Sequence, residues 1–251
     1  MLADPVFYVV SIPAVLLYGV AKGGFGGPMA ILAVPLMALV MSPTQAAAIL
    51  LPILVGMDLL VVKTYWGIFD ARALRILLPG AMLGIALGWY SADVMTDDYM
   101  RVLIGMISLW FGVQNLFGLQ NRSGKVHNRF WGTFFGTLAG FTSFSIHAGG
   151  PPLTLYLMPK NLQPLVFAGT AGIFFAVVNL VKLVPYYQLD QLGVGNLALS
   201  LVLLPLAPLG VKLGHWAVRR SDPVFYYRVI SFFLLLVGGK LLWEGLSPLL
   251  A

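Results

Sequence analysis

The sequence contains no cysteine, and only 10% of its 251 residues are charged. The absence of cysteine excludes disulfides, thiolate metal ligands and thiol nucleophiles. A soluble domain covers its surface with about 25% charged residues, so a chain of this length with so few charges is not a soluble globular enzyme. The same shortage argues against a disordered or nucleic-acid-binding chain, although the pI is about 9.6.

Apolar residues are abundant: they make up 59% of the chain, and the mean hydropathy is +0.91. One helical membrane crossing takes roughly 20 apolar residues. The apolar runs are 5–21, 28–41, 44–62, 76–92, 99–119, 130–146, 151–159, 164–184, 194–218 and 224–250. We therefore predict an all-α polytopic membrane protein, a single domain over 1–251 with about 8–10 membrane segments.

Two glycine-rich strings interrupt the apolar runs. The first is Gly23-Gly24-Phe25-Gly26-Gly27-Pro28, and the second is Gly149-Gly150-Pro151. The runs beside these strings are shorter than an ordinary span, which is typical of half-helices or of a re-entrant hairpin. Each string therefore predicts a broken or re-entrant helix.

Similar features recur in the same order in the two halves of the chain. The matches are Gly26-Gly27-Pro28 with Gly149-Gly150-Pro151, Asp58 with Asn179, Tyr65 with Tyr186, Leu78-Pro79 with Leu204-Pro205, and Arg101-Val102 with Arg228-Val229. The order predicts two homologous halves, about 1–120 and 128–251, joined by the basic linker 121–128. Each half would contain one broken helix and three transmembrane helices.

The distribution of basic residues predicts how the halves are oriented, because cytoplasmic loops are enriched in Lys and Arg. If the regions 5–41 and 130–159 each return to their starting side, one face receives eleven basic residues and the other receives two. The eleven are Lys63, Arg72, Arg75, Arg122, Lys125, Arg129, Lys160, Lys212, Arg219, Arg220 and Arg228, and the two are Arg101 and Lys182. If each region crossed once, the division would be seven against six. The uneven division favours inverted halves with both termini outside.

Paired broken helices predict an anion site, because the second half of each helix begins with unpaired amides at the positive end of its dipole. The glycines that would let an anion approach the backbone are Gly23, Gly24, Gly26, Gly27, Gly149 and Gly150. The alternative is that these glycines only permit close helix packing. We favour that packing role for another set, Gly84, Gly88, Gly210 and Gly214.

Lys22 and His147 lie beside the two strings. A buried ammonium needs a partner or a function, so Lys22 is a candidate ligand for the anion; the alternative is a lysine that extends to the interface. His147 is a candidate donor to the anion or a proton carrier, and the alternative is a hydrogen bond to backbone at the break. A single histidine is too little for a metal site, so we expect neither metal nor cofactor.

Asp58 is the one acidic residue within a long apolar run, and Asn179 is its match in the second half. A carboxylate in this position is expected to be protonated, paired or beside water. We therefore consider Asp58 a candidate for proton coupling and Asn179 its non-titrating counterpart, the alternative being a purely structural ion pair with Lys22. Lys63 and Lys182 are expected to anchor helix ends at the interface. We expect Lys240 to pair with Glu244.

Aromatic pairs are predicted at the membrane interface, where Trp and Tyr are enriched. They are Tyr65-Trp66, Tyr186-Tyr187 and Tyr226-Tyr227.

The sequence resembles the TauE/SafE family of membrane permeases, described as sulfite exporters. The resemblance runs from about residue 13 to 246. The residues that carry it are Ala21-Lys22-Gly23-Gly24-Phe25-Gly26-Gly27, Pro35, Leu51-Pro52, Asp58, His147-Ala148-Gly149-Gly150-Pro151-Pro152, Tyr156-Leu157, Asn179, Lys182 and Pro185-Tyr186. Position 28 is Pro, where the family often has a third Gly. The resemblance implies a secondary transporter of sulfur-containing anions, such as sulfite or organosulfonates, moving out of the cell.

Together these features predict a multi-pass protein of the inner or plasma membrane, not an enzyme, that moves a small anion by alternating access. Its partners would be the anion, the lipid bilayer and, if transport is coupled, protons. A passive anion channel using the same site is the first alternative. An intramembrane enzyme using His147 is the second and weaker one, since no Ser–His–Asp order or second acid accompanies that histidine.

Overall fold

The computed structural model describes residues 4–25, 28–116, 128–160, 162–218 and 223–250, and every regular element in this part of the chain is a helix. In the first half these are α1 (Pro5–Val20), the π-helical turn η1 (Ala21–Phe25), the 3₁₀ turn η2 (Pro28–Leu32), α2 (Ala33–Met37), α3 (Pro43–Tyr65), α4 (Ala71–Tyr90) and α5 (Asp97–Leu116). In the second half they are α6 (Arg129–Ile146), α7 (Gly150–Leu157), the 3₁₀ turn η3 (Met158–Lys160), α8 (Pro164–Gln188), α9 (Val194–Leu203), α10 (Leu206–Val218) and α11 (Pro223–Leu250). The prediction of an all-helical fold is confirmed.

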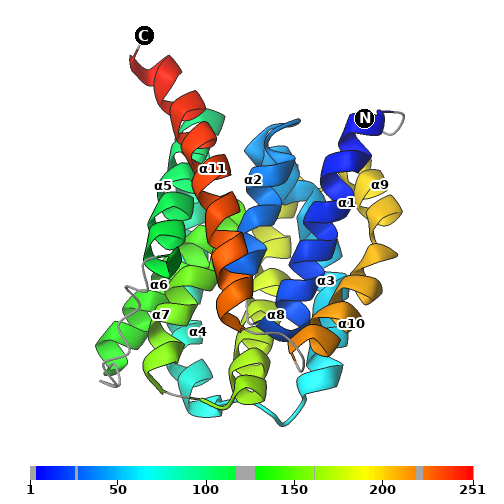
Figure 1. Ribbon diagram of the computed structural model, residues 1–251. Coiled ribbons are helices and arrows are strands. Elements are labelled where there is room, and N and C mark those ends of the chain that lie inside the picture. Colours follow the sequence, from blue (N-terminus) through cyan, green and yellow to red (C-terminus); the bar gives the residue numbers. More distant parts are fainter. Residues whose placement is uncertain (1–3, 26–27, 117–127, 161, 219–222, 251) are drawn as a thin grey trace.

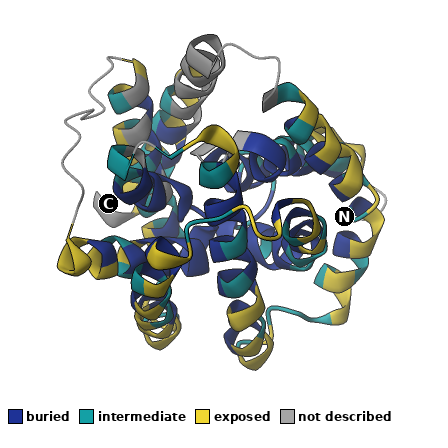
Figure 2. Cartoon of the chain, turned by 90° about the horizontal axis from the view of Figure 1, so that it is seen from below, coloured by how far each residue is buried: buried dark blue, intermediate teal, exposed yellow. Residues whose placement is uncertain are grey.

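Within the described residues, four helical stretches are long and apolar enough to cross a membrane: Pro5–Gly24, α3, α4 and α8. The pair α9 and α10, bent by 47°, makes a fifth if it is counted as one span. Buried residues gather in the middle of the bundle and exposed residues around its outside (Figure 2). Large apolar side chains such as Leu59, Leu83 and Phe130 are exposed on that outside, as expected for a surface in contact with lipid.

Helix α1 begins, and helix α11 ends, at the same end of the bundle (Figure 1). The connection between α3 and α4 and the connection between α7 and α8 lie at the opposite end. Asp70, in the first of these connections, contacts the second half of the chain: its amide donates to Thr170 Oγ1 of α8 at 2.9 Å, and its carboxylate accepts from Lys160 Nζ of η3 at 3.2 Å.

Asp70 is also the N-cap of α4, since its carboxylate accepts from the amide of Ala73 at 3.0 Å. Partial burial alone would raise the pKa of Asp70. The hydrogen bond from Ala73 and the ammonium of Lys160 outweigh that effect and hold the pKa of Asp70 below its ordinary value. Asp70 is therefore ionised at neutral pH, and it caps α4 while it pairs with the second half of the chain.

Glycines let two pairs of helices approach very closely: α4 packs along α6, and α10 packs along α1. A Cβ on Gly84 would collide with the backbone carbonyl of Thr137, and one on Gly214 would collide with that of Val20. Small residues bring membrane helices together in this way. The packing role is confirmed for all four glycines to which it was assigned, Gly84, Gly88, Gly210 and Gly214.

Candidate functional site

The first glycine string breaks the helix that begins with α1. After Val20 the backbone widens into the π-helical turn η1, and η2 starts a new segment at Pro28. The turn carries Lys22, whose residue surface is only 5% exposed. Its ammonium pairs with Asp58 and donates to the carbonyl of Leu54 at 3.3 Å. Lys22 therefore points into the bundle and does not extend to the interface.

Asp58 lies on α3 and is buried with both carboxylate oxygens in use. Oδ1 pairs with Lys22, and Oδ2 accepts from Asn179 Nδ2 of α8 at 2.7 Å. The structure thus brings together three of the residues singled out in the sequence. The ion pair with Lys22, considered there as an alternative for Asp58, is present.

The second string breaks the helix that begins with α6. That helix ends at Ile146, His147 takes a left-handed backbone conformation with φ of 54°, and α7 starts at Gly150. The His147 ring is buried, with Nε2 2.8 Å from the carbonyl of Ala47 and Nδ1 2.7 Å from Lys182 Nζ. Because a carbonyl only accepts, Nε2 donates to Ala47. Nδ1 lies beside both Lys182 Nζ and the carbonyl of Ser143, the latter at 3.2 Å. The hydrogen bond to backbone that was the alternative for His147 is present.

Lys182 was expected at the membrane interface, and this prediction is wrong. Helix α8 continues to Gln188, so Lys182 lies within the helix, and its side chain is fully buried in the bundle. Its Nζ donates to the carbonyl of Ser143 at 2.9 Å and to Ser143 Oγ at 3.1 Å, and it lies within hydrogen-bond distance of His147 Nδ1. The apolar run continues beyond Lys182 through Pro185, so this lysine lies within the span and not at its end.

The predicted interfacial position of Tyr65 and Tyr186 is also wrong. Both side chains are buried, and both hydroxyls donate to the backbone of a broken helix: Tyr65 to the carbonyl of Gly23 at 2.7 Å, and Tyr186 to that of Phe144 at 2.6 Å. Their neighbours Trp66 and Tyr187 are exposed. Tyr226 and Tyr227 are not described at side-chain level. Each broken helix is therefore fixed by a tyrosine from the long central helix of its own half.

The predicted ion pair on α11 is confirmed, since Lys240 pairs with Glu244 at 3.2 Å. Lys63 is exposed at the last turn of α3, and its role as an interface anchor stays a prediction.

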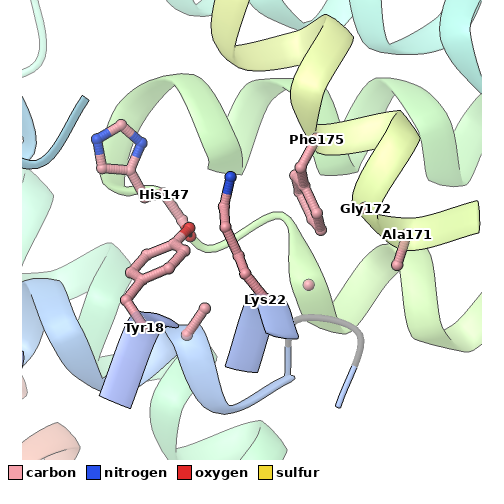
Figure 3. A pocket seen from close by; sticks show the side chains of 8 residues that line it. Tyr18, Lys22, His147, Ala171, Gly172 and Phe175 are labelled. Atoms are coloured by element: carbon pink, nitrogen blue, oxygen red, sulfur yellow. Dashed lines mark hydrogen bonds between the residues drawn. The ribbon is translucent and has the colours of Figure 1, made fainter. Parts of the chain in front are cut away.

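A small cavity lies between the two broken helices. It is lined by Tyr18, Lys22, Ala30, His147, Gly150, Ala171, Gly172 and Phe175. The Lys22 side chain reaches between His147 and Phe175 (Figure 3). The space inside is about 10 Å³, which is enough for roughly one water molecule. An oxyanion with several heavy atoms needs more room, so binding it requires the lining to move.

The glycines of the two strings have different surroundings. A Cβ on Gly23 would collide with the backbone carbonyl of Val211, and one on Gly149 would collide with that of Ala139. These two glycines are therefore needed for close packing of the backbone, independently of any role in anion binding. Gly24 is buried in η1 and Gly150 lines the cavity. The remaining two, Gly26 and Gly27, lie outside the described residues.

The amide cradle at the second break is smaller than a helix start normally provides. Pro151 and Pro152 occupy the first turn of α7 and carry no N–H. The amide of Leu153 already donates to Gly149. Of the amides at this helix start, those of Gly149 and Gly150 remain the candidate donors to an anion.

Tyr18 is a candidate site residue that was not predicted from the sequence. It precedes Lys22 by one helical turn, lines the cavity and donates to the carbonyl of His147 at 3.2 Å. Its hydroxyl thus joins the two broken helices. The spacing of four residues before Lys22 was the available signal. Within the described part of the chain, no three His, Asp or Glu side chains form a group that could hold a metal ion.

An all-helical bundle with several apolar spans, two broken helices and buried charges at the breaks is typical of membrane transporters. The family model of the sulfite exporter TauE/SafE matches residues 11–241, nearly the whole chain, and the chain belongs to this family. No curated protein and no solved structure matches it. The resemblance found in the sequence is thereby confirmed, and the chain is a multi-pass membrane transporter of a sulfur-anion exporter family.

Proposed function

We propose that this protein is a secondary transporter that exports a small sulfur-containing anion, such as sulfite or an organosulfonate, across the inner or plasma membrane by alternating access. The observation that carries the proposal is the buried Lys22 side chain, which lines a cavity between the two broken helices. In this interior a fixed cation and oriented amides attract an anion far more strongly than they do in water.

In the proposed mechanism the anion is held by Lys22, by the amides of Gly24 and of the Gly149-Gly150 pair, and from one side by His147. The cavity holds about one water molecule in the present conformation. The broken helices therefore move apart to admit the anion from one side and close before they open to the other. The two tyrosine–backbone hydrogen bonds, Tyr65 to Gly23 and Tyr186 to Phe144, lie where such movement would be controlled.

Asp58 is the proposed coupling residue, because its charge is balanced by Lys22. When the ammonium turns toward an anion, the carboxylate loses its counter-charge in a low-dielectric interior. A buried carboxylate without a cation favours its protonated form. Anion binding and proton binding at Asp58 would then be linked, while Asn179 continues to hold the side chain in place.

We further propose that the two halves are inverted repeats. Each tyrosine hydroxyl donates to a backbone carbonyl 42 residues earlier in the chain, Tyr65 to Gly23 and Tyr186 to Phe144. Asp58 and Asn179, matched in the repeat, contact each other, as expected for positions close to an axis that relates the halves. The helix packing between the halves supports the same arrangement. Helix α4 of the first half packs on α6 of the second, and α10 of the second half packs on α1 of the first.

The transport proposal predicts a particular result with radiolabelled sulfite. Proteoliposomes of the purified chain should take up sulfite, and an imposed pH gradient should change the rate. The uptake should be lost in Lys22→Ala, and its dependence on the gradient should be lost in Asp58→Asn. Uptake that ignores the gradient and far exceeds carrier turnover would instead indicate the passive channel. Chemical turnover of an anion in detergent, without compartments, would indicate the enzyme.

The inverted topology predicts the sides on which two exposed positions lie. Trp66 follows α3, and Val194 follows α8; they are 74% and 87% exposed. The chain has no cysteine of its own, so Trp66→Cys and Val194→Cys can each be labelled singly with a membrane-impermeant maleimide. Val194→Cys should react from outside intact cells, and Trp66→Cys only after permeabilisation. Reaction of both from the same side would rule out the inverted arrangement.

A further inference from the structure

A second cavity, the end pocket, lies beside the second broken helix, with Thr44 and Gln191 at its mouth and Ser145 and Tyr186 on its floor. Its space is about 40 Å³, which is enough for roughly three water molecules. Of the described residues, none lines both this pocket and the cavity around Lys22. The end pocket is therefore a separate and larger space.

The end pocket opens at the end of the bundle where the chain begins. Helix α3 ends, and α4 and α8 begin, at the opposite end (Figure 1). Thr44 at the start of α3 and Gln191 just after α8 therefore lie at the near end, and both are partly exposed. Ser145 and Tyr186 are buried. In the proposed inverted topology this end, which also carries Val194, faces outward.

The ring of His147 separates the end pocket from the cavity around Lys22. It lines that cavity, and its Nε2 lies 2.8 Å from the carbonyl of Ala47, a residue of the end pocket. The ring also stacks on that of Tyr186, with centroids 6.1 Å apart and planes inclined by 21°. The Tyr186 hydroxyl donates to the carbonyl of Phe144 at 2.6 Å. The two rings thus form a partition between the two spaces.

The lining of the end pocket is polar but, among the described residues, carries no charged side chain. It offers the hydroxyls of Thr44, Ser145 and Tyr186 and the carboxamide of Gln191. These groups can donate to an oxyanion, but they hold it less strongly than a cation would. The carboxylate of Asp97, which accepts from Thr44 at 2.8 Å, further favours release at the mouth. A site on an exit path has to bind weakly enough for the ion to leave.

We infer that the end pocket is the outer compartment of the transport path, a weak site for the same small oxyanion, and that the anion reaches it by passing the rings of His147 and Tyr186. The inference rests on the proposed function, because it gives the route by which an anion bound at Lys22 leaves. His147 lies at the break between α6 and α7, so movement of the second broken helix also moves the partition.

The chain has no cysteine, so Ser145→Cys places a single thiol on the floor of the pocket. The probe is the membrane-impermeant reagent 2-sulfonatoethyl methanethiosulfonate, added to intact cells, and the modified fraction is measured by mass spectrometry after purification. The thiol should react from the side on which Val194→Cys reacts. Methanesulfonate at about 100 mM should slow the reaction about tenfold, as expected for a Kd of roughly 10 mM. Gluconate, a much larger anion, should not.

Ser200→Cys is the matched control. Ser200 is also buried, and its hydroxyl donates to the carbonyl of Ile49 at 2.7 Å, but it lines neither space. It should not react, and Val194→Cys should react without protection by methanesulfonate. Thr44→Cys at the mouth tests the inference even if Ser145→Cys does not fold, because its reaction should also be slowed by methanesulfonate.

The partition is tested with Ala171→Cys, at a position that lines the cavity around Lys22. Its thiol should react from the same side much more slowly than that of Ser145→Cys. Tyr186→Phe removes the hydrogen bond to Phe144 and should accelerate the reaction of Ala171→Cys about three- to tenfold, the factor expected for one hydrogen bond. The reaction of Ser145→Cys should not change. Equal acceleration of both thiols would mean a general loosening and would overturn the role of the rings.

The inference and the proposed function can fail separately. If the thiols at Ser145 and Thr44 do not react, or if methanesulfonate does not slow their reaction, the inference is overturned, while sulfite uptake that depends on Lys22 would still support the proposed function. A protein that moves no sulfite would refute the proposed function and the exit path with it, even if methanesulfonate protects Ser145→Cys.

Discussion

Lys22→Met is expected to abolish sulfite transport and to lower the stability of the protein. The substitution removes the cation from the cavity and leaves Asp58 buried with Asn179 alone. Removing one partner of a buried ion pair costs about 3–5 kcal/mol because the remaining charge is uncompensated. We expect no uptake above empty liposomes, together with a lower unfolding temperature in detergent.

The double variant Lys22→Met/Asp58→Asn separates transport from stability. It has no uncompensated charge at this position, so most of the lost stability should return, while transport should remain absent because the anion has lost its ligand. Lys240→Met, which breaks the exposed pair on α11, should leave both quantities unchanged. Wild-type uptake by the double variant would show that the pair only joins α3 to the first broken helix.

Gly84→Leu is expected to prevent the protein from folding correctly, so that it aggregates instead of giving a monodisperse sample. Gly84 lies where α4 crosses α6, and any Cβ there meets the backbone carbonyl of Thr137. A backbone group cannot rotate away as a side chain can, so the two helices would have to separate. Overpacking of a tight site already costs about 1–3 kcal/mol with flexible neighbours. Size-exclusion chromatography of the detergent extract should show loss of the monodisperse peak.

The matched control for this prediction is Gly239→Leu. Gly239 is also within a helix, α11, but a Cβ built there meets nothing within 4 Å. Leucine has a better helix propensity than glycine at both positions, so the difference between the variants isolates the neighbouring helix. A Gly84→Leu protein as stable as Gly239→Leu would contradict the close packing of α4 on α6.

Local features of the sequence were sufficient for most of the fold. The apolar runs identified the helices because one membrane crossing needs a long apolar segment. Glycine followed by proline identified both breaks, since such a sequence permits a helix to end and a new one to begin. The same kind of reasoning singled out Lys22, Asp58, His147 and Asn179, because polar side chains are costly within apolar runs.

The pairing of these residues was decided by the tertiary structure. Nothing in the spacing of His147 and Lys182 indicates that their nitrogens lie 2.7 Å apart, because they are on different helices whose relative position depends on packing. Tyr65 and Tyr186 were wrongly assigned to the membrane interface because a position near a helix end does not tell which way the side chain points.

By itself, the sequence of this protein therefore determined that it is a helical membrane transporter with two breaks and a set of buried polar side chains. Only the tertiary structure decided that Asp58 pairs with Lys22 and also accepts a hydrogen bond from Asn179, and that Lys182 has no carboxylate partner among the described residues. The physical reason is that the free-energy cost of burying a polar side chain can be judged from that residue and its neighbours in the chain. Charge compensation, in contrast, depends on distances between segments that are far apart in the sequence.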